Sequence, residues 1–214
     1  MKRILASLFC TAMLLSAPVF ADLALPGEDN PVLSENSIVL NQSKYNVVKR
    51  IDSGTVTLKV FTTEGKEMWV SAPLGEQEKL FTLEGAASPL AIKDLTGDGV
   101  PELVTAAMTG PESSALYVFK FDNDSQKFTA MNFRYEKENL SRDFLVSDMY
   151  QKDGQDLVFM PENKVRALGR IYSEETGPTA GFYFFELKEN EFVCTEVAPV
   201  PVDAPTAPAV EEGK

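Results

Sequence analysis

The sequence predicts a mainly β fold, composed of antiparallel β-meander repeats that resemble propeller blades or a sandwich, with little helix. Two observations lead to this prediction. Apolar and polar residues alternate with a period of two in three separate hairpin patterns, whereas a helix would need a period near 3.6. The chain has 214 residues, of which 44% are hydrophobic and 24% charged, as is typical of a folded globular domain.

The amino end has the pattern of a secretory signal peptide. Two basic residues precede the apolar run Ile4 to Leu15, and Val19 and Ala21 place small side chains three and one residues before a cut. We therefore predict cleavage after Ala21 and a periplasmic or secreted protein. The run is too short to span a bilayer, and no later stretch reaches the roughly 18 to 20 apolar residues of a transmembrane helix, so membrane insertion is not expected.

The mature chain divides into three parts. Residues 22–35 contain proline and glycine among acidic residues and predict a loosely attached arm. Residues 36–197 form the expected single β domain. Residues 198–214 alternate proline with small residues and predict a disordered tail.

Within the body, three hairpins are predicted from alternation and from turn residues between their strands. Their strand pairs are 55–61 with 67–70, 115–121 with 127–133, and 181–187 with 191–197. The starts of the aligned segments Leu58–Phe61, Leu116–Phe119 and Phe182–Phe185 are 58 and 66 residues apart. This spacing suggests about three degenerate repeats.

Charge and composition exclude several functions. The net charge is −12, and it becomes −14 once Lys2 and Arg3 leave with the signal peptide, which disfavours nucleic acid and anionic membranes as partners. The absence of histidine removes the Ser-His-Asp and Cys-His systems and histidine-based zinc sites. Cys194 would be the only cysteine after cleavage, so no internal disulfide is expected. We assign no catalytic residue and expect no enzyme, although a hydrolase that uses a pair of carboxylates stays open.

The segment from Asp94 to Leu103 is the most informative motif. Calcium needs six to eight oxygen ligands, and a tight loop supplies them from alternating positions. The candidate ligands are Asp94, Thr96, Asp98, the backbone carbonyl of Val100, and Glu102. The alternative is an acidic β-turn whose aspartates cap the backbone.

This loop resembles the calcium loops of FG-GAP or VCBS-type repeats, which read Asp-x-Asp/Asn-x-Asp-Gly-x-x-Asp-Leu. Thr96 and Glu102 replace two of the acidic or amide ligands, and both keep an oxygen. The resemblance implies a β-repeat fold and calcium as a structural cofactor. A second copy, residues 148–157, places Lys152 at a ligand position, and we predict that it binds no metal.

A longer resemblance covers roughly residues 88–135 and is to exported bacterial VCBS-like domains related to periplasmic lysozyme inhibitors. In those inhibitors a loop with Ser-Gly-x-x-Tyr enters the lysozyme cleft, whereas here Tyr117 comes seven residues after Gly110. The resemblance implies a partner surface at Thr109, Gly110, Ser113 and Ser114. The expected function is thus an exported, calcium-binding interaction module, with inhibition of a basic lysozyme-like enzyme as the alternative, since acidity would steer such a partner.

Overall fold

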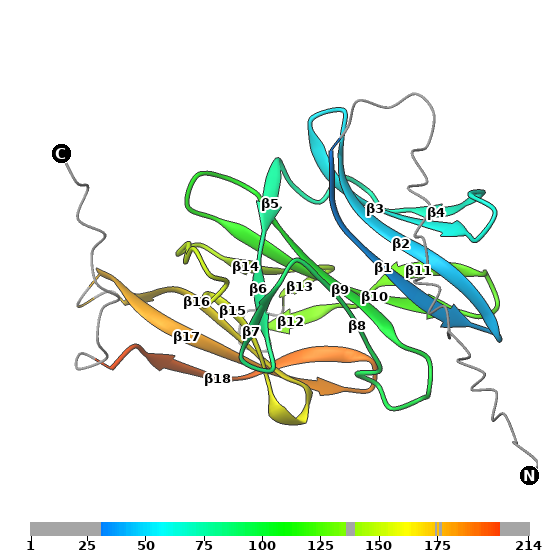
Figure 1. Ribbon diagram of the computed structural model, residues 1–214. Coiled ribbons are helices and arrows are strands. Elements are labelled where there is room, and N and C mark those ends of the chain that lie inside the picture. Colours follow the sequence, from blue (N-terminus) through cyan, green and yellow to red (C-terminus); the bar gives the residue numbers. More distant parts are fainter. Residues whose placement is uncertain (1–30, 136–139, 174, 176, 202–214) are drawn as a thin grey trace, which may run out of the picture.

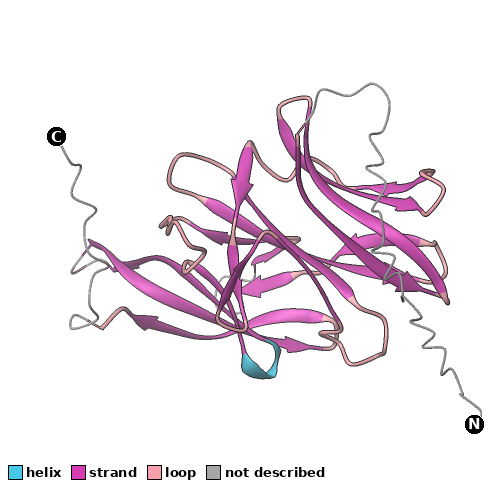
Figure 2. Cartoon of the chain, in the orientation of Figure 1, coloured by secondary structure: helices cyan, strands magenta, loops and turns pink. Residues whose placement is uncertain are grey.

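The computed structural model describes residues 31–135, 140–173, 175 and 177–201 (Figure 1). Strands dominate this part of the chain, and its one helix is the 3₁₀ turn η2 (Pro161–Asn163) (Figure 2). The predicted mainly β, antiparallel fold is confirmed. No helix in the described ranges is long and apolar enough to span a membrane. The predicted signal peptide (1–21), most of the arm (22–30) and most of the tail (202–214) lie outside the described residues.

Sheet A is the amino-terminal layer, with four antiparallel strands in chain order. Its strands are β1 (Val32–Leu40), β2 (Ser43–Asp52), β3 (Thr55–Thr62) and β4 (Glu67–Val70). β1 begins at Val32, where Val32 pairs with Arg50. The last four residues assigned to the arm therefore belong to the domain, because their backbone groups join the β2 ladder.

Sheet B lies around the long hairpin β9–β10. β5 and β8 pair with successive parts of one edge of β9, and β11 and β14 share the outer edge of β10. Its strands are β5 (Gln77–Lys79), β8 (Leu90–Lys93), β9 (Glu102–Met108), β10 (Ser114–Asp122), β11 (Lys127–Ala130) and β14 (Leu145–Ser147).

Sheet C has eight strands in the order β13-β12-β18-β17-β16-β15-β6-β7. They are β6 (Phe81–Leu83), β7 (Ala86–Ser88), β12 (Phe133–Tyr135), β13 (Leu140–Arg142), β15 (Leu157–Met160), β16 (Lys164–Ser173), β17 (Gly177–Lys188) and β18 (Glu191–Pro199). Ala198 and Pro199 pair with β17, so the domain extends two residues beyond the predicted end at 197. The described residues form no closed propeller.

Sheet B is the middle layer of three (Figure 1). Side chains alternate across a strand, so neighbouring residues of β10 face opposite sheets. Tyr117 and Phe119 pack into the cluster shared with sheet A, whereas Leu116 and Val118 pack into the cluster shared with sheet C. Burial on both faces explains why this strand is apolar almost without interruption.

The three predicted hairpins are present as β3–β4, β10–β11 and β17–β18, one in each sheet. The predicted strand 127–133 is too long, because β11 ends at Ala130 and Phe133 begins β12 of sheet C. The Asp94–Leu103 motif lies between β8 and β9, which pair with each other. The second copy of the motif, residues 148–157, lies between two strands of different sheets, since β14 joins sheet B and β15 joins sheet C. Its two strands therefore do not pair with each other, and it is a crossing between layers.

Candidate functional site

The acidic loop connects β8 to β9 at the surface of sheet B. Asp94 follows β8 directly, and its two carboxylate oxygens accept hydrogen bonds from the amides of Gly97 (2.7 Å) and Gly99 (2.9 Å). Gly97 and Gly99 have φ values of 75° and 83°, which favour glycine. Asp98 Oδ1 accepts from the amide of Val100 at 2.8 Å. The two aspartates thus hold the loop through its own backbone.

Glu102 is the first residue of β9 and is fully buried. Its Oε2 accepts hydrogen bonds from the amides of Leu95 (2.7 Å) and Thr96 (3.4 Å), and its Oε1 accepts from the Thr96 hydroxyl (3.0 Å). Burial raises the pKa of Glu102, the hydrogen bonds from Leu95 and Thr96 oppose the shift, and the negative charge of Asp98 adds to it. A nearby cation would relieve both the burial cost and the repulsion.

Two contacts tie the loop to the rest of the molecule. Lys120 of β10 places its ammonium 2.9 Å from Asp98 Oδ2 and lowers the pKa of this exposed carboxyl. Asn163 of η2 donates to the carbonyl of Leu95 at 2.6 Å. Within the described ranges, no three acidic or cysteine side chains are grouped as a metal centre requires. The predicted ligands are thus oxygen donors of the type that calcium prefers, but in this conformation they bind the loop and Lys120.

The predicted partner loop is the β9–β10 turn. Thr109 follows β9 and donates its amide to the carbonyl of Ser113 at 3.0 Å, and the two hydroxyls lie 3.1 Å apart. Gly110 packs so tightly that a Cβ would lie 2.8 Å from Ser113 Oγ. Ser114 does not belong to this surface, because it is fully buried and donates to Asp156 Oδ2.

Arg170 of β16 connects this turn to Asp148, which is distant in the sequence. Its guanidinium contacts Glu112 Oε2 at 3.2 Å and the carbonyl of Asp148 at 3.0 Å. The amide of Tyr150 donates to the carbonyl of Glu112, and the side chain of Tyr150 is 43% exposed. Sequence reasoning missed Tyr150, because nothing local to the β9–β10 turn indicates which distant tyrosine lies beside it.

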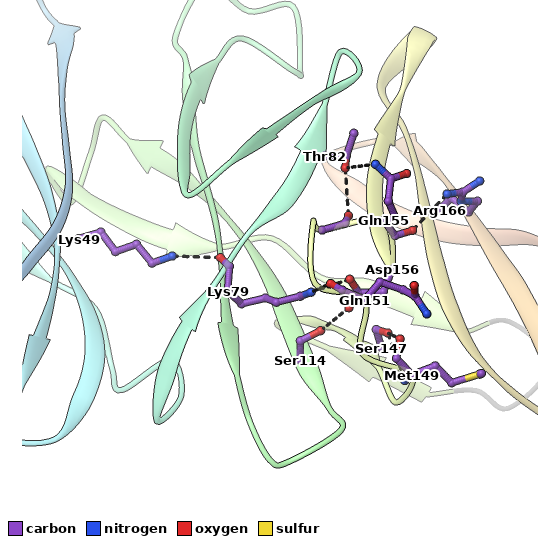
Figure 3. Close-up of polar contacts among 11 residues, drawn as sticks. Lys49, Lys79, Thr82, Ser114, Ser147, Met149, Gln151, Gln155, Asp156 and Arg166 are labelled. Carbon is purple, nitrogen blue, oxygen red and sulfur yellow. Dashed lines mark hydrogen bonds and ion pairs between the residues drawn. The ribbon is translucent and has the colours of Figure 1, made fainter. Parts of the chain in front are cut away.

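A buried polar network joins Lys79, Ser114 and Asp156 (Figure 3). The ammonium of Lys79 lies 2.6 Å from Asp156 Oδ1, and both side chains are almost completely excluded from solvent. The ammonium also donates to the carbonyl of Gln151 and lies 4.3 Å from the ring centroid of Tyr150. Since Ser114 takes the second oxygen of Asp156, the carboxylate is fully engaged in joining sheet B to sheet C.

Lys49 joins sheet A to sheet B through hydrogen bonds of its ammonium group (Figure 3). It is fully buried, and its ammonium donates to the carbonyls of Lys79 (3.3 Å), Pro89 (3.0 Å) and Ala106 (2.9 Å). Burial lowers the pKa of Lys49 from 10.5 to about 8, although the Glu78 carboxylate at 3.6 Å opposes the shift.

The second copy of the motif uses its aspartates in a structural way. Asp148 Oδ1 accepts the amide of Arg170 at 2.9 Å, and Asp156 pairs with Lys79 as described above. These contacts agree with a segment that joins layers; that it binds no metal stays a prediction.

In comparisons with known proteins, no family model matches the chain, and no curated protein or solved structure matches it either.

Proposed function

We propose that the chain is an exported binding protein without catalytic activity, in which the β8–β9 loop holds a structural calcium ion. The observation that carries the calcium proposal is the concentration of oxygen donors in this one loop. Four side chains of the loop make hydrogen bonds within the loop: the carboxylates of Asp94, Asp98 and Glu102 and the hydroxyl of Thr96. Among the described residues, the ammonium of Lys120 is the one cation paired with any of these three carboxylates.

Calcium binding requires a defined rearrangement of this loop. Asp98 must release Lys120, because the same Oδ2 atom cannot serve the ammonium and contribute fully to a divalent ion. Lys120 keeps a second partner, since it also donates to Asn190 Oδ1 at 2.8 Å. Lys120 is therefore a built-in competitor of the ion. The ion would neutralise the carboxylates and fix the β8–β9 turn.

We expect excess calcium to raise the melting temperature relative to chelator. A ligand at 100 times its dissociation constant adds about 2.7 kcal/mol when it binds only the folded state. Asp98→Asn should abolish the calcium effect, and Lys120→Gln should enlarge it by removing the competing charge. The measurement is a thermal melt of each variant with calcium and with chelator.

Asp124→Asn is the matched control, because Asp124 is an exposed aspartate of another turn, between β10 and β11. It should leave the calcium effect unchanged. Melts of the unsubstituted chain that coincide in calcium and chelator would refute the calcium site and leave the loop as a turn held by its own carboxylates.

A second candidate function is inhibition of a basic lysozyme-like enzyme. One observation favours it, namely that Tyr150 is bonded through its amide to Glu112 of the Thr109–Ser113 turn and supplies a partly exposed tyrosine that the local sequence of the turn lacks. The turn is held by Arg170 and by the Thr109–Ser113 contacts, so little conformational entropy would be lost on binding. No observation of this kind favours the carboxylate-based hydrolase.

If the chain is such an inhibitor, a molar excess should slow cell-wall lysis by a basic lysozyme. Tyr150→Ala should then weaken inhibition at least tenfold, as is common for a central tyrosine of an interface. The control is Val39→Ala, which truncates an exposed side chain on sheet A, away from the turn. Lysis rates that stay the same at a hundredfold excess of the chain would dismiss this function.

A further inference from the structure

Strand β1 forms one edge of sheet A. It pairs with β2 on one side, and no described strand pairs with its other side. β1 also contacts β8 of sheet B, but no ladder joins the two strands. Ile38, Leu40 and Leu90 share one hydrophobic cluster, so this contact lies on the inner face of sheet A. An edge strand of nine residues offers a template on which another strand can add.

The β1–β2 turn determines which backbone groups point out of this edge. Asn41 and Gln42 have φ values of 49° and 65°, as in the two-residue type I′ turn. Such a turn is closed by a hydrogen bond between the residues that flank it, Leu40 and Ser43. Because bonded and non-bonded pairs alternate along an antiparallel ladder, and the register has no shift from Leu40 to Ser34, every second residue directs its N–H and C=O away from β2. These outward residues are Glu35, Ser37 and Val39.

A side-chain contact supports this assignment. The amide of Ser37 donates to Oδ1 of its neighbour Asn36 at 2.8 Å, which agrees with an amide that β2 does not use. Glu35, Ser37 and Val39 are all exposed, and their side chains alternate with the buried Ile38. Val39 has 60% of its surface exposed. The edge therefore combines outward backbone groups with an exposed apolar side chain.

We propose that β1 pairs with β1 of a second copy of the chain, in an antiparallel ladder centred on Ser37. In this register Ser37 lies opposite Ser37 of the second copy, and Glu35 of each copy lies opposite Val39 of the other. The outward groups all find partners, since each of these pairs exchanges two hydrogen bonds. The side chains agree in direction, because residues 34–40 have no bulge. Two copies of sheet A thus become one continuous sheet.

Charge favours a second copy in this register. Pairing centred on Glu35 would place two carboxylates directly opposite each other, which destabilises a ladder, whereas pairing centred on Ser37 separates them. Glu35 of one copy then lies beside Val39 of the other, on the same face as the exposed Lys44 that pairs with Val39. The exposed valine is covered, and the acid gains a neighbouring cation. This inference is independent of the proposed function, because the acidic loop takes no part in the pairing.

Substitutions of Val39 test the pairing without changing the core, because Val39 is exposed. Sedimentation equilibrium of the exported chain should show a monomer–dimer equilibrium. Val39→Asp places a like charge opposite Glu35 twice in each dimer and should raise the dimer dissociation constant about tenfold, whereas Val39→Lys should lower it. Adding Glu35→Lys to Val39→Asp should restore dimerisation.

Ser37→Pro tests the hydrogen bonds at the centre of the ladder. The amide that it removes points away from β2, and proline is tolerated at such a position of an edge strand. Two hydrogen bonds are lost in each dimer, so the dissociation constant should rise at least tenfold.

Disulfide formation tests the register. With Cys194 changed to Ser, Ser37→Cys should form a linked dimer under mild oxidation, because the opposed Cα atoms would be about 5.5 Å apart. Glu35→Cys is the matched control on the same exposed edge. Its two Cα atoms would be about 14 Å apart, so it should link far more slowly.

Three results would overturn the proposal. A chain that stays monomeric at every concentration would refute the pairing. A dimer that Ser37→Pro and Val39→Asp leave unchanged would place the contact on another surface. Linkage of Glu35→Cys as fast as that of Ser37→Cys would refute the register. Should Ser37→Pro fail to fold, the opposite effects expected of Val39→Asp and Val39→Lys decide.

Discussion

Replacing Lys79 by methionine should lower the free energy of unfolding by about 3 to 5 kcal/mol, the largest effect that we expect from one substitution. The change leaves Asp156 as a buried carboxylate without its cation, 2.6 Å from where the ammonium stood. Ser114 and the surrounding backbone cannot supply a positive charge. Chemical denaturation of both chains at neutral pH measures the difference.

A matched control is available in the same protein. Lys93 and Glu84 also approach to 2.6 Å, but both side chains lie at the surface. Lys93→Met should therefore cost less than about 1 kcal/mol, because water screens and replaces an exposed pair. The double variant Lys79→Met with Asp156→Leu should recover most of the lost stability. Equal losses for Lys79→Met and Lys93→Met would refute the role given to burial.

The unfolding free energy should depend on pH through Lys49 more than through any other group described above. Its pKa is about 8 in the folded protein against 10.5 when unfolded. Between these values the unfolded chain binds the proton and the folded chain does not, so stability contributed by this group rises with pH across the window. The full shift corresponds to about 3 kcal/mol.

Lys49→Met separates this contribution from other titrating groups. Denaturation from pH 7 to pH 11 should show the unsubstituted chain gaining stability relative to Lys49→Met as pH rises from 8 to 10.5. Glu78 also changes its surroundings in the variant, so Glu78→Gln is measured in parallel. A constant difference across the whole range would contradict the lowered pKa.

The elements that follow from local pattern could be predicted from the sequence. The hairpins β3–β4, β10–β11 and β17–β18 each carry alternation and turn residues within about twenty positions, and all three form. The distribution of these hairpins over three layers could not be predicted. It depends on β10 being buried on both faces, and a run such as Ala115–Phe121 does not reveal which sheet covers each side.

The residues of the candidate site also fall into those that local sequence predicts and those that only the folded chain brings together. Asp94, Asp98 and Glu102 are close in sequence, so the sequence places them in one loop, and the structure places all three there. Lys120 and Tyr150 come from other strands and segments, and only the folded chain brings them to Asp98 and Glu112. The pairing of Lys79 with Asp156 likewise joins residues 77 positions apart.

The central position of sheet B also determines how the molecule can come apart. Residues of β9 and β10 belong to both hydrophobic clusters. Separation of either outer sheet from sheet B would therefore expose apolar side chains of these two strands to water. Lys49 and Lys79 fix the two junctions by charge, and the backbone of Lys79 accepts from Lys49, so the junctions meet at one residue. Lys79 of the three-residue strand β5 therefore links sheet A to the segment that enters sheet C, and we expect a substitution there to weaken both junctions.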